Sequence, residues 1–397
     1  MAYRKLVDNV FEVGAVDWNR RSFDELVPLH EGTSYNSYLI IGSEKVALID
    51  TVDPKMLGVL VDNLKEAGIK KIDYIISNHA EQDHSGSIPD ILKLFPDSKV
   101  VTNPKCKAFL QDLLLIKEED FITVNDNDKL SLGDKTLRFI IFPWVHWPET
   151  MLTYLEEDKI LFSCDLFGSH VADSRLFATK EDEILIYEGA LRYFSEIMYP
   201  FRDNIRSQFQ KVLDLDIKYI APSHGQVYEN PEFIINCYKE WTSPDVKNKA
   251  VIVYNSMHGS TEKMVEFLTS ELTKRNISVL PFHLSVTDIG RLAMEITDAA
   301  TVIVGSSQVL GGMHPSVAYA VYFYNLLRPK TKFVSVIGSF GWGGKMLEQI
   351  QNMLYNLKAE FIPPVIAKGY PKEEDFKNLE KLADNIFENH KKIGVLK

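Results

Sequence analysis

The chain has 397 residues, of which 45% are hydrophobic and 25% are charged, and its formal net charge is −11 at pH 7. This length exceeds the size at which single hydrophobic cores stop growing, so it predicts two domains. The acidic balance disfavours a nucleic-acid-binding protein, because such proteins carry a basic stripe on their surface.

The three cysteines, Cys106, Cys164 and Cys237, lie far apart and form no CxxC pair. This count is typical of a reducing compartment, and it excludes an intrinsic rubredoxin-type or iron–sulfur site, which needs four thiolates. No apolar run is long enough to span a membrane, and the N-terminus lacks the apolar segment of a signal peptide. We therefore expect a soluble cytoplasmic protein that contacts no membrane.

Up to about residue 240, short β-type runs alternate with turns and a few helical segments. Helices are expected at 54–67 and 88–95, and strands at 35–42, 45–51, 72–77, 98–103, 137–143, 159–165 and 217–223. Many short strands with few helices predict a layered α/β domain with mixed sheets. Residues 241–250 (WTSPDVKNKA) then have the composition of a linker.

From residue 250 the pattern becomes strict alternation of strands and helices. Near-continuous apolar strands are expected at 250–256, 278–284, 299–306, 332–339 and 359–367, with helices at 261–276, 290–296, 315–327, 345–358 and 373–392. This alternation predicts a doubly wound parallel sheet, in which ligands bind at the carboxyl ends of the strands.

Four side chains of the kind that bind metals, His79, Glu81, Asp83 and His84, follow the expected strand 72–77. On a helix, with about 100° between residues, the four would point in well-separated directions. On an extended segment His79 and Glu81 share a side, and a turn can bring Asp83 and His84 to an adjacent metal. We therefore expect a loop. The carboxylate of Glu81 stands where a related zinc hydrolase would carry a third histidine, which indicates iron.

Three more candidate ligands, His146, Asp165 and His224, each follow an expected strand. Any one of them alone would more often be an ordinary core, loop or capping residue, but their joint placement predicts a metal site. Histidine and carboxylate together suit iron or manganese, and seven ligands are enough for two ions. Asp165 is the natural bridge, because a carboxylate has two oxygens to share. We expect His170 beside the ligands as a hydrogen-bonding partner.

Three further loops, 256–261, 306–312 and 339–344, follow strands of the second half. The first opens a helix with hydroxyls and backbone amides, an arrangement that binds phosphate, and it lacks the GxGxxG pattern of dinucleotide sites. It resembles the phosphate loop of flavodoxins, with His258 where a hydroxyl residue is common. The other two loops would clasp a flavin ring. The candidate flavin-binding residues are Ser256, Met257, His258, Gly259, Ser260, Thr261, Ser307, Gln308, Val309, Leu310, Ser339, Phe340, Gly341, Trp342, Gly343 and Gly344.

The HxExDH motif at 79–84, followed by His146, Asp165 and His224, resembles the flavodiiron proteins, also called A-type flavoproteins. The resemblance covers the whole chain and includes the strings VGAVDW (13–18), GTSYNSYLI (32–40), HWPETM (146–151) and APSHG (221–225). It implies an N-terminal metallo-β-lactamase-like αββα domain over 1–245 with two non-haem irons. It also implies a C-terminal flavodoxin-like domain over 250–397 with FMN.

This resemblance further implies a terminal oxidoreductase that reduces dioxygen to water, nitric oxide to nitrous oxide, or both. Electrons would come through FMN from an external donor such as a rubredoxin or a reduced deazaflavin. One iron would be held by His79, Glu81 and His146, the other by Asp83, His84 and His224, with Asp165 between them. A head-to-tail homodimer, or a dimer of dimers, would bring the flavin of one chain to the irons of the other.

Two alternatives belong to other classes. The first is a hydrolase of the metallo-β-lactamase superfamily fused to a flavodoxin-like module, which uses a metal-bound hydroxide as its nucleophile. The second is a non-catalytic electron carrier. The preference between dioxygen and nitric oxide stays open at this point. Residues that we expect to set it are Trp18, Tyr35, Trp147 and His170.

Overall fold

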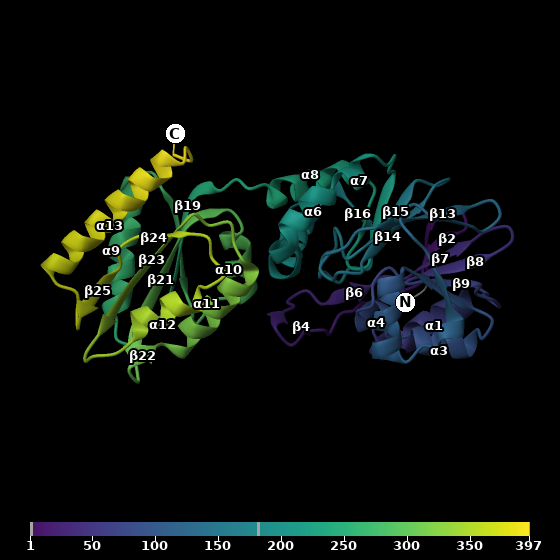
Figure 1. Cartoon of the computed structure of the whole chain (residues 1–397), viewed down its shortest axis with the longest axis horizontal. Coiled ribbons are helices and arrows are strands. Elements are labelled where there is room, and N and C mark those ends of the chain that lie inside the picture. Colours follow the sequence, from purple (N-terminus) through teal and green to yellow (C-terminus); the bar gives the residue numbers. More distant parts are fainter. Residues whose placement is uncertain (1–2, 181–182, 397) are drawn as a thin grey trace. The chain divides into compact units, whose positions relative to one another are not determined.

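The computed structural model describes residues 3–180 and 183–396. The chain divides into two compact units, Met1–Thr242 and Ser243–Lys397, which Figure 1 shows as separate sets of layers. The linker is shorter than the expected 241–250, because helix α8 (Pro231–Thr242) includes the buried Trp241 and strand β19 (Lys247–Tyr254) begins soon after it. Within the described ranges, no helix has the length and apolar character needed to cross a membrane.

The first sheet of the N-terminal unit has the order β1-β2-β7-β8-β9-β10-β11. Its first four strands are antiparallel, and the pairs from β8 to β11 are parallel. Their bounds are β1 Arg4–Val7, β2 Val10–Glu12, β7 Tyr38–Ile41, β8 Val46–Ile49, β9 Tyr74–Ile76, β10 Lys99–Thr102 and β11 Phe121–Thr123.

The second sheet has the order β12-β13-β14-β15-β17-β18-β16 and is mixed, since β15 and β17 are parallel while β12 to β15 are antiparallel. Its strands are β12 Lys129–Ser131, β13 Thr136–Ile141, β14 Met151–Leu155, β15 Ile160–Cys164, β16 Phe177–Ala178, β17 Tyr219–Pro222 and β18 Val227–Tyr228. Two short hairpin-like pairs complete the unit: β3 Ala15–Asp17 with β6 Thr33–Tyr35, and β4 Ser22–Phe23 with β5 Val27–Pro28.

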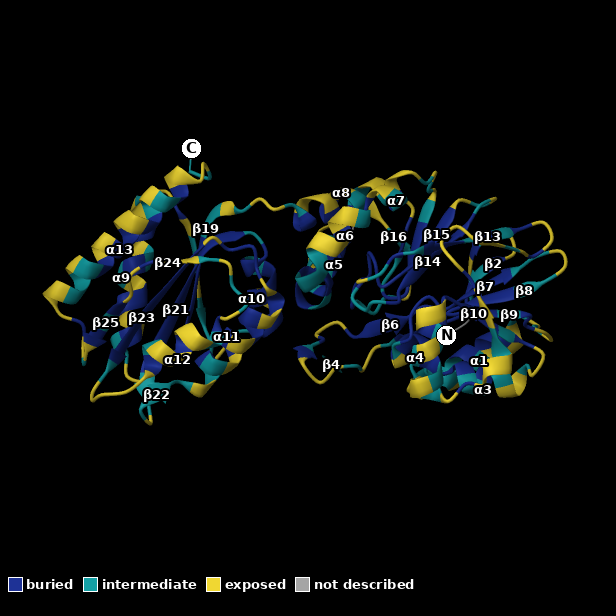
Figure 2. Cartoon of the chain, viewed as in Figure 1, coloured by how far each residue is buried: buried dark blue, intermediate teal, exposed yellow. Residues whose placement is uncertain are grey.

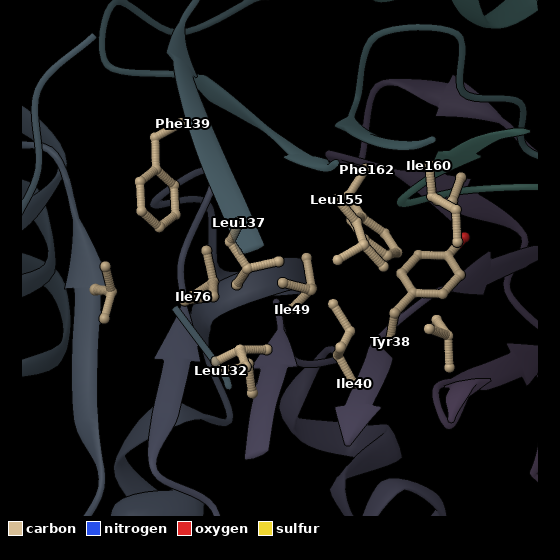
Figure 3. Close-up of a cluster of buried hydrophobic side chains, with 14 of the residues drawn as sticks. Tyr38, Ile40, Ile49, Ile76, Leu132, Leu137, Phe139, Leu155, Ile160 and Phe162 are labelled. Atoms are coloured by element: carbon tan, nitrogen blue, oxygen red, sulfur yellow. The ribbon is translucent and has the colours of Figure 1, made fainter. Parts of the chain in front are cut away.

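The two sheets pack face to face around one hydrophobic cluster (Figure 3). Side chains alternate across a strand, so Leu137 and Phe139 of β13 both point to the same side, into the cluster that also contains Ile40 and Ile49 of the first sheet. Figure 3 shows Leu137 beside Ile49. Each of these side chains is almost fully removed from water. Burial of one such side chain stabilises a fold by about 1.5–3 kcal/mol. This shared core is the rigid platform on which the loops at the strand ends are held.

Helices cover the outer faces of both sheets. On the first sheet, apolar residues of α1, α3 and α4 pack on the face opposite the shared core; on the second, the ring of Tyr238 from α8 lies 4.7 Å from Phe167, after β15. The bounds are η1 Pro54–Met56, α1 Leu57–Glu66, α2 Gln82–Ser85, α3 Ile88–Leu94, α4 Pro104–Leu114, η2 Glu118–Asp120, α5 Glu183–Tyr193, η4 Phe194–Met198, η5 Tyr199–Phe201, α6 Arg202–Gln208, α7 Gln210–Leu213 and α8 Pro231–Thr242. The expected αββα arrangement is confirmed.

The C-terminal unit contains a parallel sheet in the order β20-β19-β21-β23-β24, with β25 also paired to β23. Figure 2 shows its strands buried between helices that expose one side. This is the predicted doubly wound sheet of flavodoxin type. The elements are β19 Lys247–Tyr254, α9 Ser260–Lys274, β20 Ser278–His283, α10 Ile289–Ile296, β21 Ala299–Val309, β22 Gly312–Met313, α11 Pro315–Leu327, β23 Phe333–Phe340, α12 Met346–Met353, β24 Glu360–Phe361, β25 Val365–Lys368 and α13 Glu373–Lys392.

Two details of this unit differ from the expectation. The strand expected at 359–367 is interrupted, because Pro363 and Pro364 have no backbone N–H to donate to the ladder. The loop expected at 306–312 is largely strand: β21 continues to Val309 and pairs with β22 in an antiparallel hairpin. Of the residues expected to face the flavin at this edge, Ser307, Gln308 and Val309 therefore lie on β21, and Leu310 lies in the hairpin turn.

Candidate metal centre and flavin cavity

The stretch 79–84 combines extended backbone with one helical turn. Glu81 has extended backbone angles (φ −61°, ψ 140°), and α2 begins directly after it at Gln82. The prediction that all four ligand candidates lie in a loop is therefore wrong for Asp83 and His84, which are on α2. The helical turn has the effect expected of the loop, because Asp83 and His84 lie beside His224, whereas His79 and Glu81 lie beside His146.

The structure brings all seven predicted ligand residues together in two adjacent groups. In each group, one atom of every member lies within 4.8 Å of an atom of every other member. The first group is His79, Glu81, His146 and Asp165, and the second is Asp83, His84 and His224.

Asp165 lies between the two groups and gives one carboxylate oxygen to each. Its Oδ2 is 3.5 Å from the Nε2 atoms of both His79 and His146. Its Oδ1 is 3.0 Å from Nε2 of His84 and 3.5 Å from Nε2 of His224. A carboxylate that faces two ligand groups in this way is suited to bridge two cations.

The other two carboxylates each belong to one group. Glu81 Oε2 lies 3.2 Å from His79 Nε2 and 3.0 Å from His146 Nε2. The two oxygens of Asp83 lie 3.4 Å from His84 Nε2 and 3.2 Å from His224 Nε2. Each group therefore has two imidazoles and one carboxylate of its own, besides the shared Asp165.

The position of these residues follows from the topology. His146 lies beyond the end of β13, Asp165 directly after β15, and His224 two residues after β17, all in the second sheet. His79 and Glu81 follow β9 in the first sheet. Because the two sheets pack face to face, these strand ends meet at one edge of the sandwich.

Side chains and backbone groups around the ligands orient their rings. His79 donates its Nδ1–H to Glu149 Oε1 over 2.7 Å, and His224 donates its Nδ1–H to the backbone oxygen of Ser34 over 2.6 Å. In each case the Nε2 atom is left to face the cluster. Tyr193 donates its hydroxyl to Asp165 Oδ1 over 2.8 Å. Sequence reasoning missed these three partners, although Glu149 lies within the string HWPETM that was used for the family resemblance.

Of the four residues expected beside the ligands, three touch a ligand ring. The ring of His170 is 4.8 Å from that of His224, Tyr35 is 5.9 Å from His224, and Trp147 is 5.1 Å from His79. The hydrogen bond expected from His170 to a ligand is absent among the described residues, because its Nδ1 bonds to Thr33 Oγ1 at 2.9 Å and its Nε2 has no partner there. The side chain of Trp18 is 48% exposed and has no ring contact with a ligand among the described residues. Phe23, 4.5 Å from His170, was not anticipated.

The charge of the cluster shifts its ionisable groups strongly. Burial opposes protonation of His79, but hydrogen bonds to Glu149 and Glu81 outweigh it and raise its pKa to about 10. Burial would raise the pKa of Asp165, yet His84 and His146 hold that pKa well below its ordinary value. Carboxylates that stabilise protons on these imidazoles this strongly also stabilise a metal cation in the same place.

Among the described residues, several buried polar atoms of the cluster have no hydrogen-bond partner. They are both carboxylate oxygens of Asp83, Asp165 Oδ2, His84 Nδ1 and His224 Nε2. His84 faces the cluster with Nε2, so its Nδ1 lies on the other side of the ring, but the other four atoms belong to the facing ligand groups. Buried polar atoms are nearly always satisfied, so these four indicate a site for a cation. With four imidazoles, three carboxylates and no thiolate, the set suits iron or manganese better than structural zinc.

The C-terminal unit has a cavity of about 150 Å³ at the carboxyl ends of β19, β21 and β23. Predicted flavin-binding residues that line it are Ser256, Met257, His258, Ser260, Ser307, Gln308, Ser339, Phe340 and Gly341. Predicted residues that flank it in sequence without lining it are Gly259, Thr261, Val309, Leu310, Trp342, Gly343 and Gly344. Gly369, after β25, also lines the cavity and was missed.

One side of this cavity is the start of α9, where Gly259 has a left-handed φ of 83°. The free N–H groups of the first helical turn and the hydroxyls of Ser256 and Ser260 form a suitable anion site. The buried Ser307 hydroxyl has no partner in the described part of the chain, and Trp342 is 66% exposed. The group that fits these features has a phosphate at one end and a flat, partly apolar ring system at the other, as FMN has.

Known proteins match this chain over both of its units. A family model described as ODP family beta lactamase matches residues 33–225. The chain is 36% identical to a nitric oxide reductase of Moorella thermoacetica, over 96% of this chain and 97% of that protein. It is 31% identical to a coenzyme F420H(2) oxidase of Methanothermobacter marburgensis, over 89% and 90%.

Solved structures give the same result. The rubredoxin oxygen:oxidoreductase of Desulfovibrio gigas superposes with a TM-score of 0.93 at 28% identity, over 98% of this chain and 99% of that one. A flavodiiron protein from Giardia intestinalis superposes with a TM-score of 0.89 at 29% identity, over 98% of each chain. The similarity extends over both units, as the family resemblance implied. The chain belongs to the flavodiiron proteins.

Proposed function

We propose that this protein is a terminal oxidoreductase that reduces dioxygen to water, nitric oxide to nitrous oxide, or both. The observation that carries the proposal is the pair of ligand groups joined by Asp165, a set of largely buried side chains that would suit two adjacent cations. Iron held by these ligands would supply the single-electron chemistry that such a reduction needs. The names of the relatives, an oxidase and a nitric oxide reductase among them, fit this chemistry.

In this proposal His79, Glu81 and His146 would hold one iron, and Asp83, His84 and His224 would hold the other. Asp165 would be shared by the two, and Tyr193 keeps its carboxylate oriented by donating a hydrogen bond to Oδ1. Reduction of dioxygen to water consumes four electrons and four protons, and reduction of two nitric oxide molecules to nitrous oxide and water consumes two of each. The metals are therefore only part of the machinery, and an electron supply is needed.

The flavin cavity provides for that supply. The start of α9 would hold the phosphate of FMN, and the loops after β21 and β23 would hold its ring. A flavin can take up electrons singly or in pairs and release them singly, so it suits either a one-electron or a two-electron donor to metals that change charge one unit at a time. The donor is external, because three dispersed cysteines cannot form a rubredoxin site. A rubredoxin and a reduced deazaflavin are the two candidates.

Because the flavin cavity and the metal centre belong to different units, we also propose a head-to-tail homodimer, alone or as a dimer of dimers. Sedimentation equilibrium of the full chain would give its mass directly. A monomer at the concentration used for activity would contradict this part of the proposal without affecting the metal centre. The proposed location is the cytoplasm.

The decisive experiment is anaerobic reduction of the protein followed by stopped-flow mixing with each gas. We expect reoxidation of the flavin, monitored by its absorbance, together with consumption of dioxygen or nitric oxide and two irons per chain by metal analysis. The ratio of the two rate constants gives the substrate preference. Two zinc ions per chain with esterase turnover, or a reduced protein inert to both gases, would contradict the proposal.

A further inference from the structure

The two ligand groups have the same kinds of ligands but differ in the groups that form hydrogen bonds with their histidines. Each has two imidazoles and one carboxylate, and both share Asp165. Behind the first group, His79 donates its Nδ1–H to the carboxylate of Glu149. Behind the second, His224 donates its Nδ1–H to the neutral backbone carbonyl of Ser34, and His84 Nδ1 has no protein partner among the described residues. The first group therefore has a carboxylate, Glu149, in the position where the second group has a neutral carbonyl.

Glu149 is fixed in place. Its Oε1 also accepts a hydrogen bond from the backbone N–H of Ala80 at 3.1 Å, and its own backbone oxygen accepts one from Asn103 Nδ2 at 2.6 Å. Asn103 is held in turn as the cap of α4, where its Oδ1 accepts from two backbone N–H groups. The side chains of Glu149 and His79 have no exposed surface. No rearrangement is needed for the carboxylate to act on the imidazole ring.

The position of Glu149 gives it an electrostatic role as well as an orienting one. Its second oxygen, Oε2, is buried without a partner, and the described residues provide no lysine or arginine ion pair for it. A buried carboxylate that accepts a hydrogen bond from a ligand histidine makes the far nitrogen of that ring a stronger donor to a metal. The low dielectric of a buried site strengthens this effect.

We propose that Glu149 makes the two metal sites unequal, so that the site of His79, Glu81 and His146 binds a divalent cation more tightly and fills first. This inference rests on the ligand division proposed above. Glu149 acts as a positioning residue through His79, and removal of such an outer partner weakens metal affinity by about 10–100-fold. The second site, with its backbone carbonyl in the equivalent place, should be insensitive to Glu149.

The test measures the binding of Co²⁺ to metal-free full-length protein by visible absorption, in backgrounds that each keep one site. His224→Ala removes a ligand of the second site and leaves the first intact, and His146→Ala does the reverse. We expect tighter Co²⁺ binding in the His224→Ala protein. Adding Glu149→Gln, which keeps the shape and an oxygen acceptor for His79 but removes the charge, should weaken binding about 10–100-fold in that background and less than about 3-fold in the His146→Ala protein.

Glu118→Gln in both backgrounds is the matched control, because the Glu118 side chain is 70% exposed and far from the ligands in sequence. It should leave both dissociation constants unchanged, and circular dichroism of each variant checks that the fold is kept. Equal weakening of both sites by Glu149→Gln, no weakening of either, or tighter binding in the His146→Ala protein would overturn the inference. Failure of the unsubstituted protein to bind two Co²⁺ ions would instead overturn the proposed function.

Discussion

Asp165 shows how a single backbone position prepares the metal centre. The residue before it, Cys164, has a left-handed φ of 52°, and the pairing of β15 with β17 shifts register at the same point. A buried non-glycine residue in this region stores about 1–3 kcal/mol of strain, which the surrounding structure must offset. The kink lets the chain leave the sheet with the Asp165 carboxylate directed between the two ligand groups.

At the residue scale, Glu81→His tests whether the carboxylate at this position selects iron over zinc. The substitution removes a negative charge from the first ligand group and leaves three imidazoles there, a set that favours zinc. We expect zinc to replace iron at that site and gas reduction to fall by more than about 100-fold. Metal analysis and oxygen-electrode assays measure the two effects. Two bound irons with full activity would contradict the argument.

The strands β21 and β23, whose ends line the flavin cavity, are positioned by close packing of their backbones. Gly338 of β23 lies against the backbone of β21, and a Cβ at that position would stand 2.2 Å from the backbone oxygen of Ser306. Gly344 is equally crowded, since a Cβ there would stand 2.4 Å from Gln308 Oε1. The strand ends that line the cavity can approach each other this closely because these positions have no side chain.

Gly338→Ala should therefore destabilise the C-terminal unit by about 1–3 kcal/mol, the usual cost of overpacking a well-packed site. Thermal unfolding followed by circular dichroism measures the loss. Gly343→Ala serves as the matched control for stability, because a Cβ at Gly343 meets no atom within 4 Å. If the two substitutions lowered the melting temperature equally, close packing at Gly338 would not be the reason for the glycine.

The helix α13 and the sheet beneath it are linked by a buried histidine that makes their stability depend on pH. His390 hydrogen bonds to Thr301 Oγ1 on β21 at 2.7 Å and to Asn248 Oδ1 on β19 at 2.8 Å. Burial lowers its pKa from 6.5 to about 4. The unfolded chain thus binds a proton more readily than the folded chain, so stability is complete above pH 6.5 and is lost as the pH falls towards 4.

We expect the free energy of unfolding of the C-terminal unit to decrease by about 1–2 kcal/mol between pH 7 and pH 5 because of His390. Urea unfolding at the two pH values gives this difference. His390→Gln, which cannot titrate, should be less stable at pH 7 but should lose that part of the pH dependence. An unchanged pH dependence in the variant would show that other groups cause it.

At the scale of the whole molecule, the chemistry is divided between two units with separate cores. The metal ligands all come from residues 79–224, and the cavity residues all come from 256–369. Each unit therefore contains one candidate site of its own.

Expressed separately, residues 1–242 should bind two irons, and residues 243–397 should bind one FMN. Neither should reduce dioxygen or nitric oxide with an external donor, and a mixture at micromolar concentration should recover only a small part of the activity of the full chain. Metal analysis, flavin absorbance and gas consumption test the three statements. Full activity of residues 1–242 alone with the donor would contradict the role assigned to the flavin.

The sequence by itself determined the two fold types, because strand and helix periodicity in the second half and short strands in the first are local patterns. It also determined the seven candidate ligands, since each follows an apolar run. Only the tertiary structure decided that Asp165 offers one oxygen to each group and that Glu149, Ser34 and Tyr193 orient the ligands. Those contacts join residues that are up to 190 positions apart, and such pairings depend on how the two sheets pack, which no local pattern encodes.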